Sequence, residues 1–513
     1  MKIRKGKSIA AAVVMLLVII SVCLIIMPYK LTAQKRVEDF EYVCNTIDDT
    51  LYQLKDYEQL YGISYESLKE EYSELIADCQ DDAEFYYLLK SFLNAVPSVH
   101  TKLAFPDENT YVQLGGYNSA QQIKRFGVKK QAEYFASTLA KNACEYADAK
   151  LYLANYMDGR YYFLSADCDK IIEIDSINGQ NPDSFITGIQ SGFKIRYDHI
   201  NSKPFYPAVV FNDKYGEKSE IIGHYTDGTK VKLDLYYSVY AADVISWTQK
   251  DYENRKVKMD GNSTSDPYRL YIDEENDISY IAISSFDADS AGEIKEKTKL
   301  AAQCKNVIVD LRGNIGGYTR TEINGLFAPL FKDDVIFENT FNFRVNKFTD
   351  SITPKITISD SVIKQAIEIK ENYGTFSEKF FVFGESEKLH DLYILIDYDT
   401  ISAGDEAASL IKQYNLGMLI GNNTAGEGRT GSYLTTVLPN SRLVFSYCFG
   451  YNCVDENRDN SVYGTAPDIY VQNGINEYMR KLLLEDSLAY ENRLKWDNVL
   501  IETLEIIKEN KNA

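Results

Sequence analysis

Hydrophobic positions between residues 35 and 95 recur with the three- and four-residue spacing of an amphipathic helix. In "VEDFEYVCNTIDDTLYQL" the apolar side chains stand at positions 37, 40, 43, 47, 51 and 54. Ser64 precedes a second helical stretch as a candidate N-cap, and Pro97 ends a third. Another helical pattern, "KKQAEYFASTLAKNACEYA", follows soon afterwards. The pattern therefore predicts a helical N-terminal region at residues 28–110.

From about residue 151 the hydrophobic period shortens to that of half-buried strands. The strand-like stretches are "KLYLANYM", "RYYFLS", "KIIEIDSING" and "KVKLDLYYSV". An Asn-Gly and an Asp-Gly dipeptide, both typical of tight hairpin turns, lie among them. The pattern predicts a β-rich module at residues 151–245, followed by a polar linker or exposed loop at 250–266.

Between residues 268 and 475 short apolar runs alternate with helical patterns. The predicted strands are "ISYIAISSF", "NVIVDL", "DLYILID" and "GMLIG", and the predicted helices are "AGEIKEKTKLAAQC", "RTEINGLFAPLF" and "AGDEAASLIKQY". Apolar runs separated by helices are typical of a parallel sheet covered on both faces. We therefore expect an α/β core at residues 268–475, closed by C-terminal helices at 476–513.

The N-terminus predicts a membrane anchor. An unbroken apolar stretch at residues 9–27 is long enough to cross a bilayer as one helix. Four basic residues precede it and favour a cytoplasmic N-terminus: Lys2, Arg4, Lys5 and Lys7. A cleaved signal peptide is the alternative, but no small-residue cleavage site follows. We expect a cytoplasmic tail at 1–8, a transmembrane anchor at 9–27, and a single-pass cell-membrane protein whose bulk is extracytoplasmic.

Composition narrows the possible partners. The formal net charge of −20 would repel nucleic acid, so neither DNA nor RNA is an expected partner. The chain has eight cysteines but no C-x-x-C pair, and only four histidines, which argues against a structural zinc site. Cys448 and Cys453 could meet across a hairpin or remain buried thiols. We expect no metal and no cofactor.

Ser402 is the first candidate for chemistry. It stands between the apolar run "DLYILID" and the helical stretch "AGDEAASLIKQY", so its hydroxyl lies where open α/β sheets place their ligands. The backbone N–H groups that open the helix, led by Ala403, could stabilise an oxyanion. The same position suits a serine that merely caps the helix.

Two further stretches are candidates. "VIVDLRGNIGGY" places three glycines within five residues after a strand, which lets backbone approach a ligand and exposes N–H groups, although a tight turn needs glycine as well. His100 directly follows the third helix. Histidine is the side chain best suited to act as a base near neutral pH, but a lone histidine is often only structural.

Several segments resemble the tail-specific, or C-terminal processing, protease superfamily. "TISAGDEAASLIKQYNLGMLIGNNTAGEG" resembles its nucleophile segment, and "DLRGNIGG", "ISYIAISSFD" and "YGTAPDIYV" resemble three of its strands and loops. "SVHTKL" resembles the histidine turn of the tricorn-core branch. "IIEIDSINGQNP" resembles part of the PDZ-like module that these proteins often carry. Each motif is weak alone, but their order over residues 98–471 is fairly specific.

The resemblance implies a fold and a set of roles. The fold would be α/β: a crotonase-like αβ protease core with an N-terminal helical segment and a β-rich PDZ-like module, behind a single N-terminal transmembrane helix. Ser402 would be the nucleophile and His100 the base. Backbone N–H groups of Ala403, Gly316 and Gly317 would bind the oxyanion.

The chain departs from the family in several places, one of which is Asp405, where the family more usually has a glutamate. The processing branch uses a lysine base where this chain has Glu427, which excludes a Ser–Lys dyad and favours the histidine of the tricorn-like branch. The residue that orients the histidine is not clear from the motifs. Ser98, Asp455, Glu456 and Ser461 all stand near the expected places.

We therefore expect a membrane-anchored serine peptidase that hydrolyses peptide bonds through an acyl-enzyme. Its substrate would be a peptide or an unfolded protein, and the oligomeric state stays open. The alternative is a catalytically degenerate homologue that acts as a peptide- or ligand-binding cell-surface protein.

Overall fold

The computed structural model describes most of the chain beyond its first 29 residues. The described ranges are 30–106, 128–146, 148–164, 171–240, 267–349, 363–370, 372–430, 433–455, 458–482, 484 and 486–512. The predicted cytoplasmic tail, the predicted anchor and the predicted linker at 250–266 lie outside these ranges. Within them, no helix combines the length and apolar character needed to cross a bilayer.

The described part of the N-terminal region is built from helices. Its helices are α2 (Ala33–Thr50), α3 (Leu54–Tyr61), α4 (Tyr65–Asp78) and α5 (Asp82–Ala95), and α8 (Val128–Glu145) follows later. The apolar stripe that predicted one continuous helix is broken, since α2 ends before the extended residue Leu51. Ser64 caps α4 as predicted, accepting a hydrogen bond from the Ser67 N–H. Helix α5 ends two residues before Pro97, because the residue before proline disfavours helical backbone.

The β-rich stretch closes into a barrel, which the strand pattern alone did not predict. Its strands follow the order β2-β3-β4-β8-β9-β7. They are β2 (Leu151–Met157), β3 (Arg160–Leu164), β4 (Ile171–Ile177), β7 (Ala208–Asn212), β8 (Glu217–Tyr225) and β9 (Lys230–Tyr237). Between β4 and β7 lie the short helix α9 (Pro182–Thr187) and the hairpin of β5 (Arg196–Asp198) and β6 (Lys203–Phe205). The barrel, together with residues 178–207 between β4 and β7, is called the module below.

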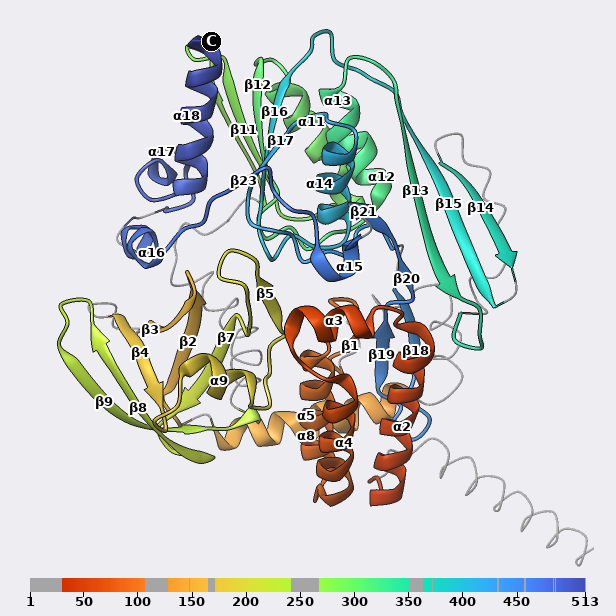
Figure 1. Cartoon of the computed structure of the whole chain (residues 1–513), viewed down its shortest axis with the longest axis vertical. Coiled ribbons are helices and arrows are strands. Elements are labelled where there is room, and N and C mark those ends of the chain that lie inside the picture. Colours follow the sequence, from red (N-terminus) through yellow and green to blue (C-terminus); the bar gives the residue numbers. More distant parts are fainter. Residues whose placement is uncertain are drawn as a thin grey trace, which may run out of the picture.

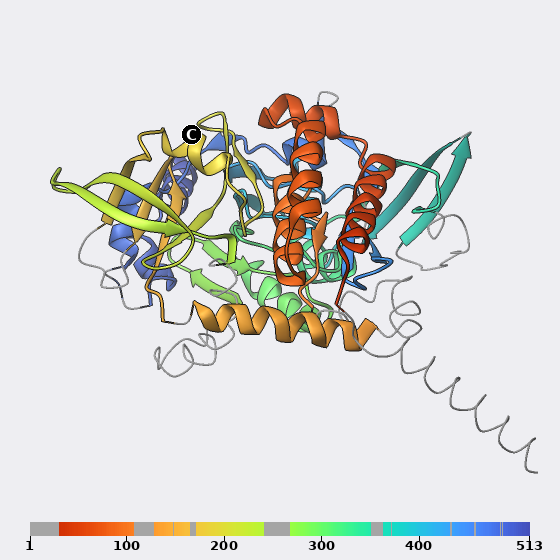
Figure 2. The ribbon, with the colours of Figure 1, turned by 90° about the horizontal axis from the view of Figure 1, so that it is seen from below.

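The module and the N-terminal helices share one hydrophobic core. Phe92 of α5 and Tyr206 of the module belong to the same cluster of buried side chains. Figure 2 shows the long orange helix α8 running beside both parts. Tyr146, just after α8, stacks edge-on against Tyr215 of the module at 5.1 Å between ring centroids. The two regions are therefore packed as one body.

The α/β core is a six-stranded sheet with the order β10-β11-β12-β16-β17-β23. The strands are β10 (Tyr268–Asp273), β11 (Ile278–Ile283), β12 (Asn306–Asp310), β16 (Asp391–Ile396), β17 (Met418–Gly421) and β23 (Ile469–Tyr470). Only the β10–β11 pair is antiparallel among these neighbours. The carboxyl ends of the parallel strands therefore meet along one edge, where the candidate residues follow.

Helices cover both faces of this sheet, as predicted (Figure 1). One face carries α11 (Ala291–Ala301), α14 (Ala403–Gln413) and a helix built from α12 (Thr319–Thr321), the π-helical turn η2 (Glu322–Phe327) and α13 (Ala328–Leu330). The other face carries α17 (Tyr490–Arg493) and α18 (Asn498–Asn512), which follow α16 (Ile475–Leu482).

Two smaller sheets were not predicted. The first has the order β14-β15-β13-β20 and projects from the core (Figure 1). Its strands are β13 (Val335–Arg344), β14 (Ile363–Lys370), β15 (Tyr373–Val382) and β20 (Gly450–Tyr451). The second joins β1 (Lys102–Leu103), β19 (Val444–Tyr447) and β18 (Leu434–Val437). Because Lys102 pairs with Ser446, the segment that carries His100 is attached to a part of the chain more than 300 residues away.

Candidate active site

Ser402 lies at a sharp turn between β16 and α14. Its backbone has φ 54° and ψ −126°, a left-handed conformation that is uncommon for a residue with a side chain. It occupies the N-cap position of α14, but its side chain makes no capping hydrogen bond. Its hydroxyl is therefore not used in the way that the capping alternative requires. A strained serine at a strand-to-helix turn is the geometry of a nucleophile elbow.

The glycine loop lies directly against Ser402. A side-chain carbon added to Gly316 would stand 2.5 Å from the Ser402 Cβ and 3.0 Å from its Oγ. Gly316 and Gly317 both have positive φ, at 89° and 146°. The Gly316 N–H donates to the Asn314 side chain at 2.8 Å, so that hydrogen is already used. The close approach explains why the loop needs glycine beside the serine.

His100 is held by Glu427. The two side chains approach to 2.9 Å between the histidine Nδ1 and the glutamate Oε2. The same carboxylate oxygen accepts a hydrogen bond from the His100 backbone N–H at 2.7 Å. Both residues are buried, with exposed fractions of 5% and 1%. The backbone hydrogen bond ties the His100 turn to Glu427, whereas the 2.9 Å approach of the ring nitrogen lacks the alignment of a hydrogen bond.

Electrostatics keep Glu427 ionised. Burial alone would raise its pKa, but contacts with the His100 side chain, the Ser98 side chain and the His100 N–H outweigh burial, so the pKa is lowered. A carboxylate with several donors favours its charged form. Glu427 therefore presents a negative charge to the imidazole.

Ser402 and Glu427 lie on paired segments. The Ser402 N–H donates to the Gly426 carbonyl at 3.3 Å, and the Ala425 N–H donates to Thr400 at 2.9 Å. Glu427 is the next residue after Gly426. The segment that flanks the serine turn therefore also carries the residue that holds His100.

Glu427 is the functional residue that sequence reasoning missed, since it was noted only as the place of a missing lysine. Among the four alternatives for orienting the histidine, Ser98 contacts Glu427 itself. The Ser461 hydroxyl instead donates to Asp459. Asp455 ends β21 (Cys453–Asp455), and Glu456 lies outside the described residues. A carboxylate at the lysine position, in a chain with a candidate histidine base, was the available signal.

The first turn of α14 is anchored by buried polar groups. Asp405 accepts hydrogen bonds from the hydroxyls of Thr424 and Thr465, at 2.5 and 2.7 Å, and from the Gly428 N–H at 2.9 Å. Burial nevertheless raises the pKa of Asp405. These contacts hold the start of the helix to the segment that carries Glu427.

A second group of carboxyls surrounds the start of α14, with Glu322 and Glu406 buried and Glu378 half-buried. Glu406 of α14 accepts a hydrogen bond from Thr319 at 2.8 Å. Burial raises its pKa to about 7, and burial together with the charge of Glu406 raises the pKa of Glu378 to about 8. Glu322, in the π-helical turn η2, is fully buried and its pKa is also raised by burial. The buried guanidinium of Arg429 stabilises the charged form of all three carboxyls.

The thiols of the described residues offer no second nucleophile. Cys448, one of the two cysteines considered for a hairpin disulfide, is a buried free thiol. Burial raises its pKa well above the ordinary value, which disfavours the reactive thiolate. The side chain of Cys453 lies outside the described residues.

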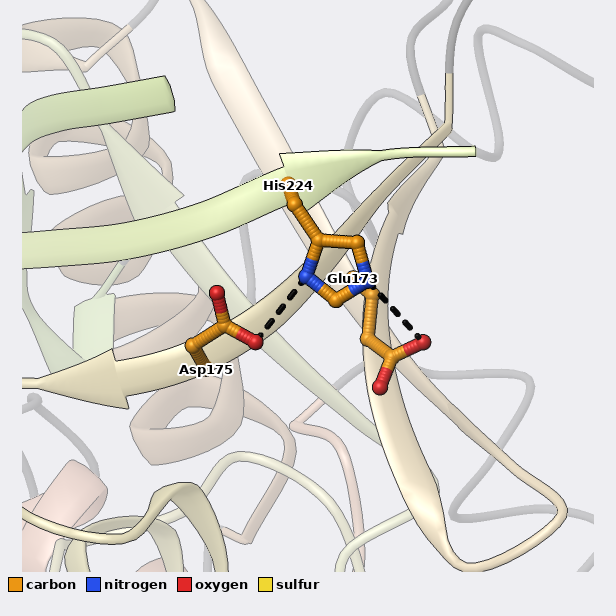
Figure 3. A group of neighbouring side chains, drawn as sticks. All are labelled: Glu173, Asp175 and His224. Carbon is orange, nitrogen blue, oxygen red and sulfur yellow. Dashed lines mark hydrogen bonds and ion pairs between the residues drawn. The ribbon is translucent and has the colours of Figure 1, made fainter. Parts of the chain in front are cut away.

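One cluster on the module has metal-ligating residue types (Figure 3). Its members are Glu173, Asp175 and His224. The His224 ring lies between the two carboxylates, with Nδ1 3.0 Å from Asp175 and Nε2 3.7 Å from Glu173. Arg160 also pairs with Glu173. Because ion pairs account for every member of the cluster, no metal is assigned to it.

Comparison with known proteins agrees with this geometry. Residues 277–471 match the model of Peptidase family S41. The structure of mature CPAF complexed with lactacystin is similar at 11% identity and a TM-score of 0.53, covering 93% of this chain and 99% of that chain. Mature CPAF alone gives a TM-score of 0.52 at 11% identity, over 88% and 96%. No protein in the curated collection matches the chain.

At such identities the likeness to CPAF shows the fold alone, whereas the family match concerns the core that holds the serine turn and the glycine loop. The protein is thus a serine-type peptidase. Its core at residues 277–471 matches peptidase family S41, which supports the tail-specific protease superfamily.

Proposed function

We propose that this peptidase hydrolyses peptide bonds through an acyl-enzyme on Ser402, with His100 as the base and Glu427 as the residue that orients it. The observation that carries the proposal is the pairing of two segments. The strained, non-capping Ser402 is hydrogen-bonded to Gly426, and the next residue, Glu427, contacts the His100 ring. A nucleophile, a base and an orienting carboxylate are the parts that such catalysis needs.

In this proposal His100 takes the Ser402 proton as the hydroxyl attacks the carbonyl carbon, and returns a proton to the leaving amine. A water then attacks the acyl-enzyme, again with His100 as base, and frees the serine. Glu427 presents the ring in the tautomer with Nδ1 protonated, since Oε2 lies beside that nitrogen. The second ring nitrogen is then available to accept the serine proton.

The oxyanion would be bound by the N–H groups of Ala403 and Gly317. Ala403 opens α14, where the helix dipole favours negative charge. Gly316 remains essential for the close approach, but its own N–H is used by Asn314. We therefore propose the N–H of Gly317, rather than that of Gly316, as the second oxyanion donor.

The substrate would be a peptide or an unfolded protein segment. Ile315 and Tyr318 flank the glycines and are 69% and 63% exposed, so a peptide that approaches the loop meets apolar side chains. A histidine base would place the chain in the tricorn-like branch of the superfamily. The apolar stretch at residues 9–27 would anchor the enzyme in the cell membrane, with the catalytic part outside the cytoplasm.

A covalent serine probe tests the proposal. A fluorophosphonate should label the wild type and leave Ser402→Ala unlabelled, and it should label His100→Gln at least 100-fold more slowly, because the base is lost. Peptide hydrolysis should follow the same order. If the folded wild type is neither labelled nor active, the chain is the degenerate, ligand-binding homologue instead.

A further inference from the structure

We propose that Lys194 of the module is a positioning residue for His100. The inference rests on the proposed function and adds a residue that does not touch the reacting atoms. The Lys194 ammonium donates to three backbone carbonyls, those of Leu93, Val96 and Thr101, at 2.5, 2.7 and 2.7 Å. These three carbonyls enclose the turn on which His100 lies.

The position of the acceptors makes Lys194 a clamp on this turn. Leu93 lies in the last turn of α5, where carbonyls have no partner within the helix and a cation is favoured. Val96 precedes the turn, and Thr101 directly follows His100. A lysine ammonium has three donors, and all three are used here. One side chain therefore closes the start of the turn onto its end.

The clamp is part of a larger contact between the module and the helices. The Ile195 N–H donates to the Asn94 carbonyl at 3.0 Å, and the Asn94 side chain donates to the Ser191 carbonyl at 3.1 Å. Residues 191–195 of the module are thus tied to the end of α5 on both sides of Lys194. The position of the turn depends on this segment of the module as well as on Glu427.

The same segment reaches the serine side of the site. Arg196, two residues after Lys194, lies 3.8 Å from the Asp399 carboxylate in the turn that leads to Ser402. Phe205 of β6 packs edge-on against Tyr398 in that turn, at 5.2 Å between ring centroids. The module therefore contacts both the turn that carries the base and the turn that carries the nucleophile. The hydrogen bonds of Lys194 to the first turn are shorter than the contact of Arg196 with the second.

The three carbonyl contacts of Lys194 argue for a positional role. The Lys194 side chain is half-buried with its ammonium among three carbonyls, and desolvation lowers its pKa well below the ordinary value, while the charge of Glu427 acts in the opposite direction. A desolvated ammonium is costly, and an apolar side chain would fill the space without that cost. What methionine at this position could not do is hold three carbonyls at fixed positions around the turn. A displacement of about 1 Å in a catalytic group can lower the rate about 100-fold.

The test compares Lys194→Met with the matched control Lys203→Met. Lys203 lies in the same module and also bonds a backbone carbonyl, that of Gly159 at 2.5 Å, besides the Asp183 carboxylate at 2.6 Å. Turnover is measured per probe-titrated active site, so that unfolded protein does not count. Lys194→Met should lower kcat by about 10- to 100-fold with KM changed less than about threefold. Lys194→Arg, which keeps the charge, should recover most of the loss, and Lys203→Met should keep the wild-type kcat.

An NMR readout tests positioning without turnover. The ring signals of His100, assigned by their loss in His100→Gln, should shift in Lys194→Met and stay in place in Lys203→Met. If Lys194→Met does not fold, Lys194→Gln replaces it with the same expectation, since its amide offers two hydrogens to three carbonyls.

Three outcomes separate the inference from the function. Wild-type kcat per active site in Lys194→Met, or equal losses in both lysine variants, overturns the role of Lys194 while the peptidase stands. An inactive, unlabelled wild type overturns the proposed function, and the ring signals then decide whether Lys194 positions His100. Unchanged ring signals in Lys194→Met overturn the positional role in either case.

Discussion

A left-handed backbone at a serine costs free energy, of order 1–3 kcal/mol, that the surrounding structure must offset. Two contacts offset this cost at Ser402. Its N–H donates to the Gly426 carbonyl, and Asp405 in the first turn of α14 accepts a hydrogen bond from the Gly428 N–H. In this conformation the hydroxyl makes no hydrogen bond to the helix N-terminus. The residue is thus shaped for chemistry at the expense of local stability.

Gly316→Ala should abolish most turnover, by about 100-fold or more, because the added carbon collides with Ser402. It should also lower stability by about 1–2 kcal/mol, since φ is 89°. Gly313→Ala is the matched control: its φ is 68°, but nothing lies within 4 Å of the added carbon. Thermal midpoints and turnover per labelled site separate strain from collision. Equal turnover in the two variants would remove the loop from the site.

Glu427→Gln should lower kcat by about 100- to 10,000-fold, because the amide cannot supply the charge that stabilises a protonated His100. Glu427→Lys, which restores the lysine of the processing branch, should be inactive as well. Its ammonium would repel the positive charge that His100 carries once it has taken the serine proton. Hydrolysis of a peptide substrate by folded protein checks both variants. Activity in Glu427→Lys would mean that a Ser–Lys dyad can form here.

For single residues, sequence reasoning identified the candidate site residues but not the residues that contact them. Ser402 and the glycines carry local signals, in the form of a strand, a turn and a helix within a few residues. Glu427 acts on a residue 327 positions earlier, and no local pattern reports such a contact. The use of the Gly316 N–H by Asn314 depends on loop geometry, which the glycine spacing does not encode.

The elements around the site bring three glutamate side chains together, which burial makes costly to ionise. Glu322 lies in η2, Glu378 in β15 and Glu406 in α14, so three elements each contribute one carboxyl beside Arg429. Their raised pKa values mean that the neutral forms are favoured in the folded protein. Ionising these groups must therefore weaken the packing of the elements.

This predicts a loss of stability with rising pH. The folded-state pKa values of Glu406 and Glu378, about 7 and about 8, lie above the ordinary value. Below about pH 4 both carboxyls are protonated in the folded and the unfolded protein, so their raised pKa values do not change the free energy of unfolding. As pH rises towards 8, the unfolded protein ionises first and the free energy of unfolding falls. Glu378→Gln should reduce the fall in the thermal midpoint between pH 5 and pH 9 by several degrees. Parallel curves for the variant and the wild type would contradict this account.

The elements themselves were largely predictable where the pattern was periodic. The N-terminal helices and the strands of the core followed from spacing, because burial on one face imposes a period. The sheet of β13, β14 and β15 was missed, since its alternation lies in a stretch interpreted as a connection between core elements. Closure of the barrel depends on contacts between strands distant in sequence, which the strand pattern does not specify.

For the whole molecule, the anchor is the open prediction. Deleting residues 1–27 should yield a soluble protein with unchanged kcat, because the deletion keeps the buried Leu31, which is hydrogen-bonded to Asp82 just before α2. Full-length protein should stay with the membrane fraction after a high-salt wash. Recovery of a mature chain that starts near residue 30 would instead identify a cleaved signal peptide.

The attachment of β1 to β19 sets the order in which a newly made chain can become active. His100 emerges early from the ribosome, but its partner Glu427 and the pairing residue Ser446 come more than 300 residues later. At a synthesis rate of about 5–20 residues per second, this interval is roughly 15 seconds to a minute. During that time the growing chain has no complete catalytic set. In the proposed mechanism the chain therefore cannot cleave peptide bonds, its own included, until this pairing has formed.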